Sequence, residues 1–128
     1  MTVGISTVAV ADRMLDWLRG AAPATIAGLY LKLHTGDPGA AGTANASAVT
    51  TRPQITMAAA SGGSMSLSSA SGSYTMTATE TITHVSVWDA STAGTFLMSM
   101  ALTTSRSVVN GDVLTINSVT ISHTPLAA

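Results

Sequence analysis

Hydrophobic and polar positions follow two different periods along the chain, and the first of them is helical. After Ser6, apolar residues recur every three or four positions, which predicts one amphipathic helix. Its apolar stripe consists of Val8, Val10, Ala11, Met14, Leu15, Trp17 and Leu18. Ser6 or Thr7 can cap its start, Gly20 suits its end, and Pro23 prevents its continuation. Because the stripe is wide, we expect the helix to pack on the domain's own sheet or, as the alternative, on a neighbouring subunit.

From Thr25 onward the period changes to two, which is typical of half-buried strands. Residues 28–35 place three leucines on one face and Tyr30, Lys32 and His34 on the other. Asp, Pro and Gly in 36–39 then favour a tight turn. Small residues continue to about Thr51, and this long segment is typical of a loop that serves as an interaction arm.

The remainder alternates in short runs between turn residues, which predicts antiparallel hairpins. The runs cover 55–57, 65–67, 74–78, 81–89, 95–102, 106–109, 113–117 and 119–123. Asn110-Gly111 is the strongest two-residue hairpin motif among their connections. The pattern predicts a mainly β fold, an antiparallel β-sandwich or jelly-roll-like domain of about eight strands with one N-terminal α-helix.

Length and composition fit one domain over residues 1–128. We expect the helix and a linker in 1–24, the β domain in 25–128, and the loop arm at about 36–51. Ala, Ser, Thr and Gly make up more than half of the chain, only 9% of residues are charged, and the formal net charge is −1. Only four charged residues follow Arg52, far fewer than an exposed monomer surface carries. We therefore expect the surface to be covered by copies of the same chain or by another protein.

The same composition excludes several function classes. Five scattered cations provide no basic stripe for nucleic acid. Without cysteine there is neither a disulfide framework nor a thiolate metal site. The uncharged stretch 53–79 is interrupted by glycines, Gln54 and many hydroxyl residues, so we expect no membrane span, and no secretory signal is predicted.

No group of residues in the sequence predicts catalysis or cofactor binding. His34, His84 and His123 lie on three different predicted strands without metal-ligand spacing, so each is expected to be a hydrogen-bonded surface or rim residue. His84, Ser86 and Asp89 are close in sequence, but strand alternation puts Asp89 on the opposite face from the other two. We therefore expect no catalytic, cofactor-binding or metal-binding residues, and no cofactor.

Several segments resemble a known family. They are LYLKLHTGDPG at 29–39, AAASGG at 58–63, ITHVSVWDASTAGTFL at 82–97, ALTTS at 101–105 and NGD at 110–112. Together they resemble small structural proteins of tailed bacteriophages, which carry the labels tail fibre, minor tail or head-decoration protein. The family pattern also has an acidic residue and a Tyr-Ala-Arg segment, of which 50–53 keeps only Arg52.

The resemblance implies a non-enzymatic virion component made in the host cytoplasm. Our first expectation is a capsid-decorating or minor capsid protein, a homo-oligomer such as a trimer that binds the major capsid protein. The alternatives are a minor tail or tail-fibre-base protein bound to tail proteins, and a receptor- or carbohydrate-binding module, which would need an exposed cluster such as Tyr30, His34 and Trp88. The candidate assembly contacts are Val10, Met14, Trp17, Asp37, Pro38 and Trp88.

Overall fold

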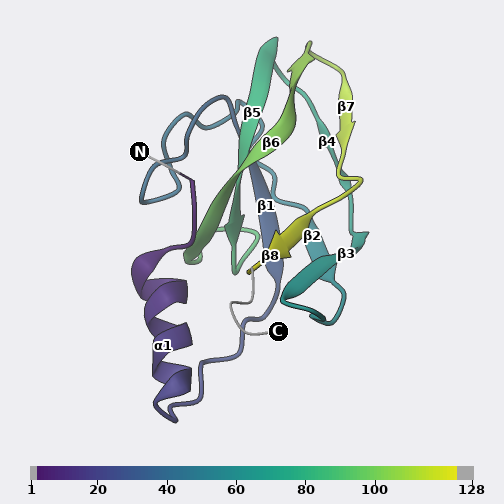
Figure 1. Cartoon of the computed structure of the whole chain (residues 1–128). Helices are drawn as coiled ribbons and strands as arrows, with labels where there is room; N and C mark the ends of the chain where they lie inside the picture. The colour runs from purple at the N-terminus through teal and green to yellow at the C-terminus, as the bar shows by residue number, and fades with distance from the viewer. Residues whose placement is uncertain (1–2, 124–128) are drawn as a thin grey trace.

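The computed structural model describes residues 3–123 as a curled antiparallel sheet with a helix projecting from one end (Figure 1). A short π-helical turn, η1 (Thr7–Ala11), continues directly into α1 (Asp12–Leu18). Eight strands follow in chain order: β1 (Leu29–His34), β2 (Gln54–Met57), β3 (Ser64–Ala70), β4 (Ser73–Thr75), β5 (Glu80–Trp88), β6 (Phe96–Val108), β7 (Val113–Thr115) and β8 (Thr120–Ser122). The predicted mainly β fold with about eight antiparallel strands and one N-terminal helix is confirmed.

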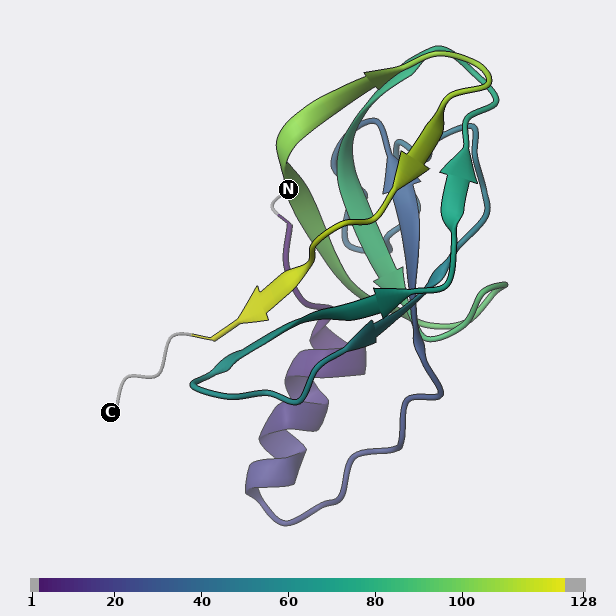
Figure 2. The same cartoon turned by 90° about the vertical axis from the view of Figure 1, so that its right-hand side faces the viewer.

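Six strands form the main sheet, in the order β6-β5-β1-β2-β3-β8, and β4 pairs with β7 in a separate ribbon. Seen from the side, the sheet curls and the ribbon lies across its concave face (Figure 2). The Tyr74 hydroxyl of β4 donates a 2.7 Å hydrogen bond to the Leu31 carbonyl of β1, and this bond joins the ribbon to the sheet. Burial of the Tyr74 ring raises the pKa of its hydroxyl above its ordinary value.

Apolar residues at every second position of β1 and β5 form the centre of the hydrophobic core. In the ladder, Leu31 lies opposite Val87 and Leu33 opposite Val85, so these four side chains share the inner face. All four are buried, and residues of the ribbon pack against them. The leucine pattern at 28–35 therefore predicted both the strand and its buried face.

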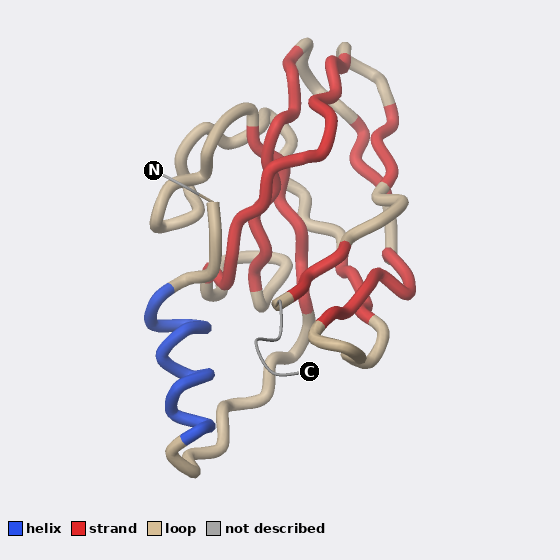
Figure 3. Tube along the Cα trace, in the orientation of Figure 1, coloured by secondary structure: helices blue, strands red, loops and turns tan. Residues whose placement is uncertain are grey.

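The helix is placed differently from the first expectation. No residue of α1 is buried, and the tube view shows α1 extending away from the sheet (Figure 3). Only the first turn is attached, through Ala9 and through backbone bonds that the preceding residues make to the edge of β6. Ser6 N donates to Leu97 O at 2.7 Å, and Ser99 N donates to Gly4 O at 2.8 Å. The expectation that the helix packs on its own sheet is wrong, because the contact with the sheet ends before α1 begins.

The Asn110-Gly111 motif forms a turn, but its flanking strands do not pair with each other. Gly111 has φ +95°, a left-handed conformation that suits glycine. Instead of pairing with β6, β7 pairs with β4, with Tyr74 opposite Leu114. The hairpin expected here is corrected: the turn reverses the chain, and the strand after it pairs with a partner far away in sequence.

β6 is one strand interrupted by a wide bulge. Ile82 of β5 lies opposite Arg106, whereas His84, two residues later, lies opposite Ala101. Four residues of β6, 102–105, therefore stand opposite Thr83 alone, which is three more than a regular ladder contains, and they bulge out of it. The sequence divided this region into the runs 95–102 and 106–109, and the bulge is the physical reason for the interruption.

The segment 36–51 has no helix or strand of its own, but it is not a free arm. Thr35 N donates to Asn45 O and Ser47 N donates to Leu33 O, so the segment pairs with the end of β1. Pro38 and Val49 are buried within it. The expected loop at about 36–51 is therefore present and packs against the sheet, since its small residues allow close backbone pairing, and its role as an interaction arm stays a prediction.

Candidate functional site

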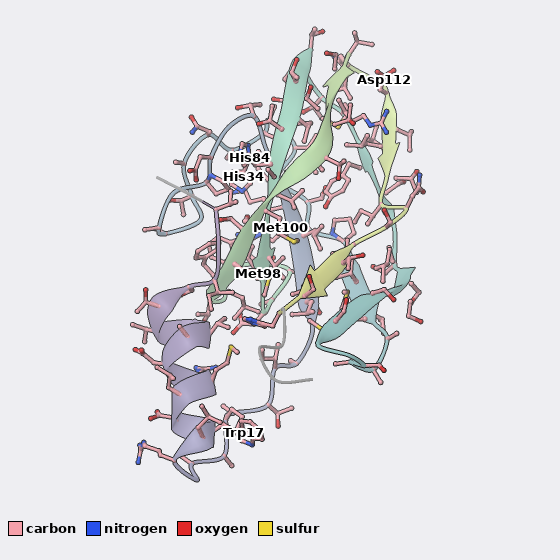
Figure 4. All side chains as sticks on the ribbon, viewed as in Figure 1. Trp17, His34, His84, Met98, Met100 and Asp112 are labelled. Atoms are coloured by element: carbon pink, nitrogen blue, oxygen red, sulfur yellow. The ribbon has the colours of Figure 1, made fainter. Side chains whose placement is uncertain are left out.

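The N-terminal helix carries the largest group of exposed apolar side chains. Ser6 caps its start, since the Ser6 hydroxyl accepts from Ala9 N, and Gly20 follows its end with φ +96°. Among the predicted contacts, Val10 is half-buried, whereas Met14 and Trp17 are 43% and 63% exposed. Figure 4 places Trp17 at the end of α1 far from the sheet.

Three further side chains of the stripe are more exposed than the predicted contacts Val10 and Met14. Val8, Leu15 and Leu18 are 75%, 63% and 72% exposed. All three belong to the helical repeat read from the sequence, but they were not singled out as contacts. The structure therefore presents an apolar helix face that the described part of the chain does not cover.

Charged side chains occupy the other side of this helix. Asp12, Arg13, Asp16 and Arg19 lie between the apolar positions, so the helix has two acidic and two basic residues. Arg19 Nε donates to Asp16 Oδ1 at 2.7 Å, but both side chains are well exposed, so this pair adds little stability. The helix is amphipathic, with no net charge of its own.

The other predicted contacts lie on or inside the β domain. Asp37 is half-buried, and its Oδ1 accepts from Gly39 N at 2.8 Å, which closes the predicted turn. Pro38 is fully buried and Trp88 is only 7% exposed. These two side chains are covered by the chain's own atoms, and at Trp88 the cover includes Phe96 and Arg52, which pack on its ring.

A buried series of hydrogen bonds lies on the face of the sheet that carries His34. The sequence did not predict it. His34 Nδ1 lies 2.8 Å from Ala44 O, which can only accept, so Nδ1 carries the proton. His34 Nε2 therefore accepts from the Ser86 hydroxyl at 2.7 Å, and Ser86 Oγ in turn accepts from Trp88 Nε1 at 2.8 Å. Each donor has one acceptor, so the orientation of the whole relay (Trp88, Ser86, His34 and the Ala44 carbonyl) is determined.

This relay corrects two expectations. His34 is not a surface or rim residue but is fully buried, with His84 beside it on the neighbouring strand (Figure 4). Because His34 and Trp88 are covered, the cluster with Tyr30 that a receptor-binding module would need is not exposed. Strand alternation does place all of these residues on one face, and that was the available sequence evidence.

The chemistry of the relay is structural. A Ser–His pair at 2.7 Å has the spacing of a nucleophile and its base, but Ser86 is fully buried and no substrate can reach it. The residues near it in sequence are engaged elsewhere: His84 bonds Thr83 Oγ1, and Asp89 Oδ1 accepts from Thr95 N. Within residues 3–123, no three potential metal ligands gather at one point.

The surroundings of His34 make its neutral form the stable one. Burial lowers the pKa of His34 below its ordinary value of 6.5, and the hydrogen bond to Ala44, the next largest influence, acts in the opposite direction. The positive charges of Lys32, His84 and Arg52 also lower the pKa. Since the unfolded chain takes up a proton near pH 6.5 and the folded chain does so only at lower pH, the contribution of His34 to stability is complete above that pH and is lost below it.

We expect the free energy of unfolding to fall between about pH 7 and pH 5, by up to about 1.4 kcal/mol per pH unit for this one group. Urea titrations at several pH values measure the slope. His34→Gln removes the titrating group, so the variant should be less stable at pH 7 but should lose less stability on acidification. An equal slope in both proteins would mean that His34 is not the responsible group.

No helix within residues 3–123 is long and apolar enough to cross a membrane. A comparison with the curated proteins gives no match. One family profile, described as Podophage GP4 fiber I protein gp80, matches residues 4–124, which is nearly the whole chain. The protein therefore belongs to the Podophage GP4 fiber I protein gp80 family, and it is a structural component of a bacteriophage virion.

Proposed function

We propose that the protein is a tail-fibre component whose subunits associate through their N-terminal helices. The family match carries the assignment to the tail fibre, because the description of the family names a fibre protein. That description favours the tail alternative over our first expectation, a capsid-decorating protein bound to the major capsid protein. Tail proteins are then the proposed partners on the virion.

The exposed helix supports association between copies of the chain. Its apolar side chains extend around about half of the helix, and half a circumference is enough to contact two neighbours in a small bundle. Its two acidic and two basic residues lie on the opposite side and leave the helix without net charge, so copies of the helix can approach through their apolar faces without repulsion. A closed assembly such as a trimer is consistent with these features.

Copy number and position on the particle test the tail assignment. Quantitative mass spectrometry against the major capsid protein gives the copies per virion, and gold-labelled antibody shows their location by electron microscopy. We expect a small number of copies and labelling at the tail. Hundreds of copies distributed over the head would contradict the tail assignment and restore capsid decoration.

A further inference from the structure

Two cations lie side by side on the outer face of the sheet. Tyr30 pairs with Gln54, and Leu31 N donates to Pro53 O at 3.1 Å, so the next step of the β1–β2 register brings Lys32 opposite Arg52. Like charges in such a position repel each other. Among residues 3–123, neither has a carboxylate within ion-pair distance. The fold therefore holds two neighbouring positive charges without compensation.

Arg52 is fixed in place on one side. Its Nη1 donates to Ala93 O at 2.7 Å and to Ala90 O at 3.3 Å, and the guanidinium carbon lies 4.1 Å from the centre of the Trp88 ring. Trp88 is itself held by its bond to Ser86. The orientation of the guanidinium is thus set before any ligand arrives, which lowers the entropy lost on binding.

The other donors of this pair are not used by the described residues. In the described part of the chain, Nε and Nη2 of Arg52 and the ammonium of Lys32 have no hydrogen-bond acceptor. No buried side-chain nitrogen or oxygen there lacks a partner, so these free donors are accessible to water. A planar guanidinium with two free donors matches the two oxygens of a carboxylate or phosphate.

A hydroxyl-rich hollow has Arg52 in its wall. Its volume is about 490 Å³, and its lining includes Thr50, Thr51, Arg52, Ser71, Ser91 and Thr92. Burial lowers the pKa of Lys32, and the charge of Arg52 lowers it further, so an added anion would stabilise the charged form. Burial lowers the pKa of Arg52 as well. A sugar that carries an acidic group can bind such a surface, with its acidic group on the cations and its hydroxyls on the hydroxyl side chains.

We propose that this hollow, which has Arg52 in its wall, binds an anionic saccharide whose carboxylate or phosphate group reaches Arg52 and the neighbouring Lys32. The acidic group bonds to the free donors of the two cations, and the sugar hydroxyls bond to the threonine and serine hydroxyls. Binding is electrostatic in part, so it weakens as salt is added.

Nuclear magnetic resonance titration of the full chain tests the proposal with four probes. Glucuronate presents a carboxylate on a sugar, glucose 6-phosphate presents a phosphate on a sugar, glucose has no charge, and inorganic phosphate has no sugar. We expect the two acidic sugars to shift the amide signals of Thr51, Ser91 and Thr92, with weak or no effect from glucose and inorganic phosphate. The more effective acidic sugar identifies which of the two anions is preferred.

Lys32→Gln should weaken binding of the preferred sugar about tenfold, because a charge-assisted hydrogen bond is lost. Arg13→Gln removes the same charge from the exposed helix and serves as the matched control, with unchanged affinity expected. Arg52→Lys keeps the charge but removes the planar fork, and it should also weaken binding. The spectrum of each variant reports whether its fold is intact.

Three results would overturn the proposal. One is the absence of shifts at the hollow with either acidic sugar. Another is glucose or inorganic phosphate binding as tightly as the acidic sugars. The third is equal affinity of Lys32→Gln and wild type. All three are measured on the isolated chain, so they are independent of where the protein sits on the virion.

Discussion

Ser86→Ala should lower the free energy of unfolding by about 2–4 kcal/mol, because it leaves two buried polar groups without partners. In the native chain, the Ser86 hydroxyl donates to His34 Nε2 and accepts from Trp88 Nε1. Removing the oxygen leaves both nitrogens in a site that water does not reach, and each unsatisfied group carries a desolvation cost. The loss is therefore much larger than the volume of one hydroxyl suggests.

Ser99→Ala is the matched control for this prediction. Ser99 lies opposite Ser86 in the ladder and is also buried, but within residues 3–123 its hydroxyl accepts a single bond, from Gly4 N at 3.3 Å. We expect Ser99→Ala to cost less than about 1 kcal/mol. Chemical denaturation followed by circular dichroism compares the two variants. If both variants lose the same free energy of unfolding, the hydrogen bonds of the relay do not give Ser86 a special contribution to stability.

The strands that could be predicted from the sequence are those with an uninterrupted period of two. In β1, the leucines at 29, 31 and 33 face the core, and the valines of β5 lie opposite two of them. Hydrophobic alternation reports burial directly, since a residue on the wrong face would be exposed. The same reasoning correctly placed Lys32 and His34 on one face.

The burial of His34 could not be predicted in this way. Alternation placed it on the polar face, and that face is half-exposed at Lys32 but fully covered at His34. The cover is the loop 36–51, whose Ala44 carbonyl accepts from the imidazole. Small residues without a period carry no information about where a loop folds back, so the relay became visible only with the structure.

The pairing of strands that lie far apart in the sequence was the other feature that could not be predicted. Asn110-Gly111 specifies a chain reversal, but the partner of β7 is β4, nearly forty residues earlier. The bulge at 102–105 shifts the register of β6 against β5. Turn chemistry acts over a few residues, whereas strand order depends on the packing of the whole sheet.

Burial of the helix was overestimated for a related reason. A wide apolar stripe shows that a helix needs a partner, but it does not identify that partner. Leu15 and Leu18 remain exposed in the isolated chain. Low charge density and this stripe both support the proposal that the partner is another protein chain.

The double variant Leu15→Glu, Leu18→Glu should abolish self-association and incorporation into particles. It places two negative charges on the apolar face, and burying an unpaired charge in a contact costs several kcal/mol. The β domain should fold as before, because both side chains are exposed and α1 makes little contact with the sheet. We therefore expect an unchanged melting temperature together with a monomeric chain.

Sedimentation velocity measures the oligomeric state, and protein content of particles grown with each variant measures incorporation. Arg13→Gln, Arg19→Gln changes the net charge by the same two units on the polar side of the helix, so it separates the effect of charge from that of the apolar face. We expect this control to assemble and incorporate at close to wild-type levels. Oligomers and full incorporation in the double glutamate variant would contradict the proposed role of the helix, and attachment would then have to come from the β domain. Loss of both in the double glutamate variant alone would show that one exposed helix face joins the subunits and holds them on the virion.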